Sequence, residues 1–185
     1  MLRLASQEFR MILLTIKIIV AFFIGSLPFG IIICQGFGLN PPNTYGSKNI
    51  GASNVARQHK IAGFITLMLD AAKGYTAIKL LGAMDIILLF AVLGHCFSPL
   101  MRFNGGKGIA TYGGALIALN PPLAATLGMI WVLTFVKQQK PAIASILICT
   151  VSIIYALIAH KYLLLATCLI IILRHKENVM QLQNT

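Results

Sequence analysis

The sequence predicts an all-α, polytopic integral membrane protein with about seven transmembrane helices. Of the 185 residues, 58% are hydrophobic and only 10% are charged, whereas a soluble domain carries roughly 25% charged residues. Long apolar runs alternate with short segments rich in Gly, Pro and cations. The net charge of +11 is scattered between these runs, which favours a topology signal and an anionic ligand over nucleic-acid binding. We expect one transmembrane domain over residues 1–185.

The first apolar run covers residues 11–34 and follows a short polar lead at residues 1–10. Gly25 and Pro28 interrupt this run. A membrane helix tolerates such residues where neighbouring groups satisfy its backbone. Because no clear small-residue cleavage site leads into a soluble domain, we expect a retained helix rather than a signal peptide. A long polar loop at residues 35–60 follows.

Six further apolar runs complete the predicted bundle. The sequence Asn120-Pro-Pro122 separates two of them, because consecutive prolines break a helix strongly. A span usually needs about 20 apolar residues, and several runs are shorter. Six crossings are therefore the alternative, if residues 109–136 bend instead of crossing twice. The six runs are residues 61–82, 86–97, 109–119, 123–136, 141–159 and 162–173.

Seven crossings would place the polar loops alternately on the two sides of the membrane. One side would hold only Asp85 and Lys161, and the other would hold most of the cations. The positive-inside rule then assigns the cationic side to the cytoplasm, although Arg3 and Arg10 argue the other way. Three donor-rich segments would share that side and could build one site. Its cations are Lys48, Arg57, Lys60, Arg102, Lys107, Lys137, Lys140, Arg174 and Lys176.

The first donor-rich segment, residues 45–57, contains hydroxyls, amides and cations but no carboxylate. Glycines let backbone N–H groups turn toward an anion, and Ser, Asn and Arg side chains add further donors. We therefore predict that this segment binds phosphate. The alternative is a polar connection between two helices that is stabilised by turn chemistry alone. Its candidate phosphate ligands are Ser47, Asn49, Asn54 and Arg57.

The second segment, residues 102–111, contains Gly105-Gly106-Lys107-Gly108 immediately before a predicted helix. A glycine-rich turn with one cation, followed by a helix N-terminus, suits an anion. The spacing is not that of a Walker A loop, and a tight turn is the alternative. The third segment, Arg174-His-Lys-Glu-Asn178, follows the last span. A basic signal at the membrane exit explains this segment, taken alone, better than a site does.

Two groups at membrane depth leave their roles open. Asp70 and Lys73 lie three residues apart and therefore on one helix face. We favour an internal ion pair that fixes helix packing over direct catalysis. His95, just before the glycine segment, suits a structural hydrogen bond better than a catalytic role. The four cysteines are isolated from one another, so we expect neither a disulfide framework nor a metal site.

The segments as a set resemble the bacterial acyl-phosphate:glycerol-3-phosphate acyltransferase family. The resemblance covers nearly the whole chain. It is carried in order by residues 25–30, 45–57, 70–74, 94–97, 103–111 and 174–178. The first loop, the glycine loop and the terminal His-x-Glu-Asn pattern are specific as a combination. The chain departs from the family pattern at Lys48, where Gly is usual, and at Ser53, where Thr is usual. The cytoplasmic turn at the start of the sixth run usually contains serine, and here it reads Lys140-Pro-Ala-Ile-Ala-Ser145, so that only Ser145 remains as a candidate.

This resemblance implies a seven-helix enzyme of the bacterial inner membrane, with its site facing the cytoplasm. The implied reaction transfers a fatty acyl group from acyl-phosphate to the 1-hydroxyl of sn-glycerol 3-phosphate. It gives lysophosphatidic acid and phosphate, the first step of phospholipid biosynthesis, and needs no cofactor. An enzyme that produces acyl-phosphate is an implied partner. The implied catalytic residues are Ser47, Arg57, Lys107, His175 and Asn178, and the implied glycine loop is Gly105, Gly106 and Gly108.

The residues favour direct transfer without an acyl-enzyme. Acyl-phosphate already has a good leaving group, so positioning and charge stabilisation matter more than a strong nucleophile. A phosphate oxygen of a substrate is the expected base, and His175 is the best protein alternative. The rival function is a carrier or channel for a phosphorylated metabolite. However, carriers bind near the bilayer midplane and often contain inverted repeats. A weaker third reading is a structural subunit of a lipid-synthesis complex.

Overall fold

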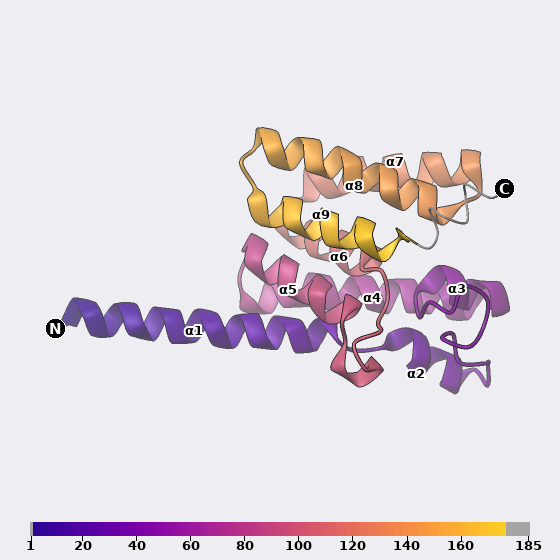
Figure 1. Cartoon of the computed structure of the whole chain (residues 1–185), viewed down its shortest axis with the longest axis horizontal. Helices are drawn as coiled ribbons and strands as arrows, with labels where there is room; N and C mark the ends of the chain where they lie inside the picture. Colours follow the sequence, from indigo (N-terminus) through magenta and orange to yellow (C-terminus); the bar gives the residue numbers. More distant parts are fainter. Residues whose placement is uncertain (1, 177–185) are drawn as a thin grey trace.

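The computed structural model describes residues 2–176, with side chains from residue 7, and all its regular secondary structure is helical (Figure 1). The expected all-α class is therefore confirmed. The predicted residues Glu177 and Asn178 lie outside the described residues. The α-helices are α1 Leu2–Gly25, α2 Phe29–Gly36, α3 Ala52–Gln58, α4 Lys60–Leu81, α5 Asp85–Cys96, α6 Ile109–Leu119, α7 Pro121–Gln138, α8 Pro141–Ile158 and α9 Tyr162–Arg174, with a 3-10 turn at Pro99–Met101.

The first apolar run forms two helices, α1 and α2, separated at Ser26-Leu-Pro28. Two carbonyl groups at this break accept hydrogen bonds from side chains of other elements. Ser98 Oγ donates to the Ser26 carbonyl at 2.7 Å, and Lys73 Nζ donates to the Leu27 carbonyl at 2.9 Å. These bonds satisfy backbone that the helix break leaves open, which a membrane environment requires.

Two expectations for the N-terminal third are corrected. The polar lead at residues 1–10 does not stand apart, because α1 already begins at Leu2, and the first part of α1 projects beyond the bundle (Figure 1). The loop at residues 35–60 contains a helix, α3, which follows an extended Gly51. The later helices begin and end within a few residues of the predicted runs. Residues 109–136 form two helices that pack against each other, not one bent helix.

Small residues allow the central helices to pack closely. A Cβ atom on Gly74 would clash with the Thr111 carbonyl, and one on Gly114 would clash with the Ala71 carbonyl. Helices α4 and α6 therefore meet backbone to backbone from both sides. Gly25 and Gly94 bring α1 and α5 together in the same reciprocal way. Close approach at small residues is the usual basis of helix association in membranes.

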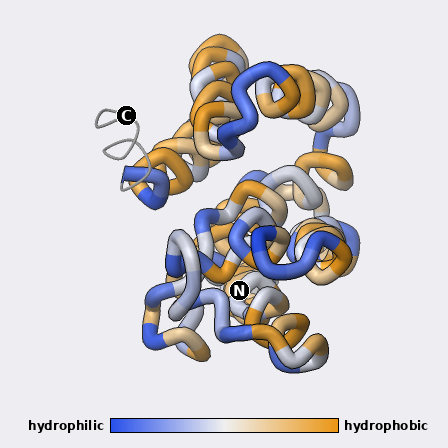
Figure 2. The backbone as a smooth tube through the Cα atoms, turned by 90° about the vertical axis from the view of Figure 1, so that its right-hand side faces the viewer, coloured by the Kyte–Doolittle hydropathy of each residue, from blue (hydrophilic) through white to orange (hydrophobic). Residues whose placement is uncertain are grey.

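Three of the described helical segments are long and apolar enough to cross a membrane: Gln7–Gly36, Lys60–Leu81 and Pro141–Ile158. Large apolar side chains such as Phe64, Leu133 and Ile154 are exposed on the outside of the bundle. The hydropathy colouring shows apolar backbone along the helices and polar segments at the connections (Figure 2). The integral membrane class agrees with these features, while the count of seven spans stays a prediction.

The polar connections that matter for function lie at one end of the bundle. Figure 1 shows α3, the turn from α7 to α8 and the end of α9 together at the end away from the N-terminus. The helix α6 begins there, after the glycine loop. The expectation that the donor-rich segments share one side of the protein therefore holds for their described residues.

Candidate active site

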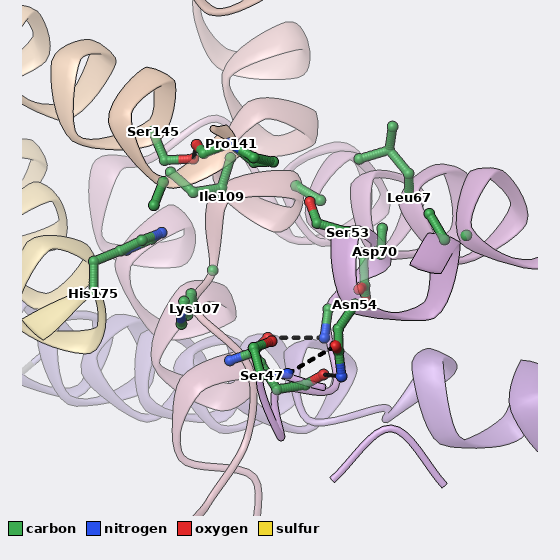
Figure 3. A pocket seen from close by; sticks show the side chains of 18 of the residues that line it. Ser47, Ser53, Asn54, Leu67, Asp70, Lys107, Ile109, Pro141, Ser145 and His175 are labelled. Carbon is green, nitrogen blue, oxygen red and sulfur yellow. Dashed lines mark hydrogen bonds between the residues drawn. The ribbon is translucent and has the colours of Figure 1, made fainter. Parts of the chain in front are cut away.

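A cavity of about 500 Å³ lies among these connections. Its walls come from the first loop and α3, the first half of α4, the end of α5, the start of α6, the α7–α8 turn and the end of α9. Figure 3 shows Lys107 and His175 on one side of the opening and Ser53, Leu67 and Asp70 on the other. Segments that are more than 100 residues apart in sequence thus form one site.

Most of the predicted site residues line this cavity. Gly105 and Gly106 do not line it, although the Gly108 that follows them does. Asn178 lies outside the described residues, so its place in the site stays a prediction. The predicted residues in the lining are Ser47, Asn49, Asn54, Arg57, Lys107, Gly108 and His175.

The buried side chain of Asn54 organises the first loop. Its Oδ1 accepts a hydrogen bond from the Ser47 backbone N–H at 3.0 Å. Its Nδ2 lies 2.8–2.9 Å from the carbonyl oxygens of Pro42, Tyr45 and Asn49. The amide is therefore engaged by the loop that folds around it. This arrangement favours a role in holding Ser47 in place over direct contact between Asn54 and phosphate.

Two residues of the same loop, one on each side of Ser47, lie in the left-handed backbone region. Gly46 has φ of +54°, and a Cβ there would meet the Asn54 side-chain oxygen. Lys48 also has φ of +54°, at the position where the resemblance expects glycine. A residue with a Cβ atom loses roughly 1–2 kcal/mol in this conformation. The Lys48 side chain is exposed and does not line the cavity.

The glycine loop is fastened between two helices. The N–H groups of Gly105 and Gly106 donate to the carbonyls of Cys96 and His95, at the end of α5. In turn, the Arg174 guanidinium donates to the carbonyls of both glycines, at 2.8 and 3.2 Å. These two glycines therefore shape the loop, and their N–H groups are engaged by α5 instead of being directed at a ligand.

Two helix N-termini face the cavity. Gly108, with φ of +88°, precedes α6, and its neighbours Ile109 and Ala110 join it in the lining. Lys140 and Pro141 begin α8 and also line the cavity. A helix N-terminus carries backbone N–H donors and a partial positive charge. Together with the Arg57, Lys107 and Lys140 side chains, these ends make the cavity suited to anions.

Helix α7, the α7–α8 turn and the start of α8 contribute further residues to the lining. Ser145 Oγ donates to the Pro141 carbonyl at 2.8 Å and accepts a bond from the Trp131 indole at 3.2 Å. The sequence left Ser145 in doubt, and the structure places it in the lining. Gln139, Lys140 and Trp131 line the cavity as well. The sequence had placed Lys140 among the cations of this side, whereas Trp131 and Gln139 are revealed only by the folded arrangement of α7 and α8, because no sequence motif marks these two positions.

Asp70, Lys73 and His95 form a buried cluster beside the cavity. Lys73 Nζ lies 2.7 Å from Asp70 Oδ1, and both side chains are at most 3% exposed. The expected ion pair is therefore present. Lys73 also bonds to the α1–α2 break, which ties the pair to helix packing as expected. However, Asp70 and His95 line the cavity, so that these two residues also face the site.

His175 follows the last turn of α9, and its ring points into the cavity (Figure 3). Nδ1 lies 2.8 Å from the Ile171 carbonyl oxygen. Because a carbonyl can only accept, Nδ1 carries the hydrogen of the neutral ring. The other ring nitrogen, Nε2, lies on the side that points into the cavity. Burial lowers the pKa of His175 to about 4, with the positive charges of Lys107 and Arg174 acting in the same direction. His175 is therefore neutral at pH 7 without a bound anion.

One part of the lining is apolar. Phe64 and Leu67 on α4 are exposed on the outer surface of the bundle. Both also line the cavity, together with Trp131 on α7 and Ala142 on α8. The cavity thus joins a cationic, donor-rich region to an apolar surface. Such a combination suits a ligand with an anionic head and a hydrocarbon tail.

Comparisons with known proteins agree with this description. The sequence model of the family described as glycerol-3-phosphate acyltransferase matches residues 15–185. The glycerol-3-phosphate acyltransferase of Jannaschia sp. (strain CCS1) is 37% identical over 179 residues, covering 91% of this chain and 88% of the relative. That of Neisseria gonorrhoeae is 36% identical over 180 residues, covering 88% and 90%.

Solved structures give the same result for the fold. The crystal structure of PlsY (YgiH), an integral membrane glycerol 3-phosphate acyltransferase, in its glycerol 3-phosphate form, superimposes with a TM-score of 0.82. The two sequences are 29% identical, and the match covers 92% of each chain. The lysophosphatidic acid form of PlsY matches with a TM-score of 0.80, also at 29% identity, over 92% of this chain and 91% of that one.

Proposed function

This chain belongs to the glycerol-3-phosphate acyltransferase family, and we propose that its cavity transfers a fatty acyl group from acyl-phosphate to glycerol 3-phosphate. The chain is an integral membrane acyltransferase. The acceptor is the 1-hydroxyl of sn-glycerol 3-phosphate, and the products are lysophosphatidic acid and inorganic phosphate. The observation that carries the proposal is the cavity itself, in which Ser47, Arg57 and Lys107 meet beside an apolar surface.

The charge of the cavity suits two phosphorylated substrates. Both acyl-phosphate and glycerol 3-phosphate are anions that repel each other in water. Arg57, Lys107, Lys140 and the N-termini of α6 and α8 supply positive charge around one space. Donors that are fixed before the substrates arrive need no reorganisation during the reaction. We propose that Ser47, Asn49, Arg57, Lys107 and Gly108 hold the phosphates, while Asn54, Gly105 and Gly106 shape the loops that position them.

The transfer step needs little help from a protein nucleophile. The 1-hydroxyl oxygen attacks the acyl carbonyl carbon, the bond from that carbon to the phosphate oxygen breaks, and phosphate leaves with the electron pair. The hydroxyl proton passes to a phosphate oxygen of a substrate. His175 is the protein alternative, because its Nε2 is unprotonated and faces the cavity. However, a base with a pKa near 4 is weak at neutral pH, which favours the substrate phosphate.

The acyl chain of the donor enters from the bilayer. We propose that it lies along Phe64, Leu67 and Trp131, where the cavity reaches the apolar surface. We further propose that residues 1–185 form one transmembrane domain with seven crossings in a bacterial inner membrane. The cationic end, which contains the cavity, would then face the cytoplasm. An enzyme that makes acyl-phosphate would supply the donor there.

The test is phosphate release by the purified protein in lipid, with palmitoyl-phosphate as donor. We expect release that depends on glycerol 3-phosphate, with an equal amount of lysophosphatidic acid. Absence of product, combined with saturable uptake of glycerol 3-phosphate into vesicles, would replace the transferase with a carrier. Activity only in a larger complex would point to a structural subunit.

A further inference from the structure

We propose that Asp70 and His95 form a hydroxyl-binding subsite that recognises the glycerol hydroxyls of glycerol 3-phosphate. This inference rests on the proposed function, because it assigns one part of the same cavity to the alcohol groups of the acceptor. It concerns a part of the lining that differs in charge and hydrogen-bonding character from the residues proposed to hold phosphate. Asp70 lies across the opening from Lys107 and His175 (Figure 3).

The first observation is the sign of the charge. Among the described residues of the lining, Asp70 is the only acid, whereas Arg57, Lys107 and Lys140 are cations. A carboxylate repels a phosphate, but it accepts hydrogen bonds from hydroxyl groups readily. This region of the cavity therefore matches a neutral group that donates, and the substrate offers such groups in its hydroxyls.

The second observation is that Asp70 is held firmly as an ion. Lys73 Nζ lies 2.7 Å from Asp70 Oδ1 and also donates to the Leu27 carbonyl at 2.9 Å. A buried carboxylate persists in its charged form where an opposite charge and hydrogen bonds compensate it. Lys73 itself is absent from the cavity lining. The Lys73 ammonium thus compensates the charge of Asp70 from outside the cavity, while the carboxylate remains part of the cavity wall.

The third observation is that a buried ring nitrogen of His95, beside this carboxylate, has no hydrogen-bond partner among the described residues. The His95 side chain is 4% exposed, and its Nδ1 has no hydrogen-bond partner among residues 2–176. Nδ1 lies 3.6 Å from Asp70 Oδ1, which is too long for a hydrogen bond. Buried polar atoms are almost always bonded, so a ligand is the expected partner. One hydroxyl oxygen could contact both atoms at about 2.8 Å, accepting from His95 and donating to Asp70.

The fourth observation links this subsite to the phosphate residues. The His95 ring packs against Gly106, where a Cβ would clash with His95 Nε2. The His95 carbonyl accepts the Gly106 N–H at 3.0 Å. Lys107 follows Gly106 directly in the chain. The packing and the hydrogen bond between His95 and Gly106 thus fix the backbone beside Lys107 relative to the His95 ring, so that phosphate and hydroxyl recognition are positioned together.

The test compares two ligands that differ only in their hydroxyls, sn-glycerol 3-phosphate and propyl phosphate. Each competes against radiolabelled glycerol 3-phosphate for the purified protein in lipid. We expect the wild-type protein to bind glycerol 3-phosphate at least about tenfold more tightly, since a site built for hydroxyls disfavours analogues that lack them. The double variant Asp70→Leu, Lys73→Met and the single variant His95→Phe should bring this ratio close to one. Their affinity for propyl phosphate should stay within about twofold of the wild-type value.

Two control variants separate recognition from general damage. Asp85→Asn removes an ion pair with Lys161 (3.0 Å) outside the cavity lining, and it should keep the wild-type ratio. His95→Asn places an amide donor near the Nδ1 position, and it should restore part of the ratio lost in His95→Phe. Unchanged ratios in Asp70→Leu, Lys73→Met and His95→Phe, or equal loss of both ligands, would overturn the subsite. Absence of glycerol 3-phosphate-dependent phosphate release in the wild-type protein would instead overturn the proposed function.

Discussion

The guanidinium of Arg174 donates a 2.8 Å hydrogen bond to the carbonyl oxygen of Gly105, which joins the end of α9 to the glycine loop. A second bond reaches the Gly106 carbonyl at 3.2 Å, and the guanidinium also lies 5.4 Å from the centre of the Phe97 ring. One side chain thus fixes the loop that carries Lys107. In the sequence, Arg174 looked like part of a basic signal at a membrane exit.

Arg174→Lys should lower transfer activity at least about tenfold, although it keeps the charge. A lysine ammonium cannot reproduce the planar fork that bonds two adjacent carbonyls, so the loop and Lys107 would lose their fixed position. The measurement is steady-state transfer with saturating palmitoyl-phosphate. Lys176→Gln is the control, because this neighbouring cation is exposed and lies outside the cavity lining. Wild-type rates in Arg174→Lys would show that the two carbonyl bonds do not position the site.

Ser47→Ala and Lys107→Ala should each reduce transfer by about 10²-fold or more. Both residues line the cavity, and loss of one donor to developing charge typically costs this much. Phosphate release under the assay described above is the measurement. Arg102→Ala removes an exposed cation outside the lining and should stay near the wild-type rate. If both cavity variants keep wild-type rates, the assignment of phosphate binding to these residues is wrong.

Lys48→Gly should stabilise the protein by about 1 kcal/mol, because glycine adopts the left-handed conformation of residue 48 without a Cβ penalty. The more flexible unfolded chain will offset part of this gain. Since the Lys48 side chain does not line the cavity, kcat should stay within about twofold. Thermal unfolding in detergent and transfer assays measure the two quantities. Gly113→Ala, at a helical position where a Cβ meets nothing within 4 Å, is a control for glycine replacement. A destabilised Lys48→Gly protein would contradict the proposed strain.

Helix boundaries were predictable where local chemistry marks them. Gly108 and Asn120 bracket α6, and prolines begin α7 and α8, so the predicted runs and the observed helices agree closely. The short helix α3 could not be predicted in the same way. Its seven residues are mostly polar or small and lack the apolar period that identifies a helix. Its position depends instead on packing of Val55 and Ala62 with Cys34 beneath the loop.

The membership of the site was predictable to a similar extent. Ser47, Arg57, Lys107 and His175 lie in segments whose composition or order indicated a phosphate site. The sequence could not show which donors are already engaged. The N–H groups of Gly105 and Gly106 are bonded to α5, and the Asn54 amide is bonded to its own loop. Those partners come from tertiary contacts, which have no signature in a local motif.

His175 should make the protein lose stability as the pH falls from about 6.5 to 4. Burial lowers its folded-state pKa to about 4, while an unfolded His has a pKa near 6.5. Between these values the unfolded chain binds more protons, so the free energy of unfolding rises with pH and is fully gained above 6.5. The difference corresponds to roughly 3 kcal/mol.

The unfolding temperature of His175→Gln should therefore fall less than that of the wild-type protein as the pH is lowered from 7 to 4.5. His160→Gln, at an exposed position outside the cavity lining, should retain the wild-type slope. Equal slopes in His175→Gln and the wild-type protein would mean that His175 is not held neutral by its surroundings. Bound glycerol 3-phosphate should also reduce the wild-type slope, because the negative charge of a phosphate in the same cavity favours the imidazolium and raises the pKa of His175 toward its unfolded value.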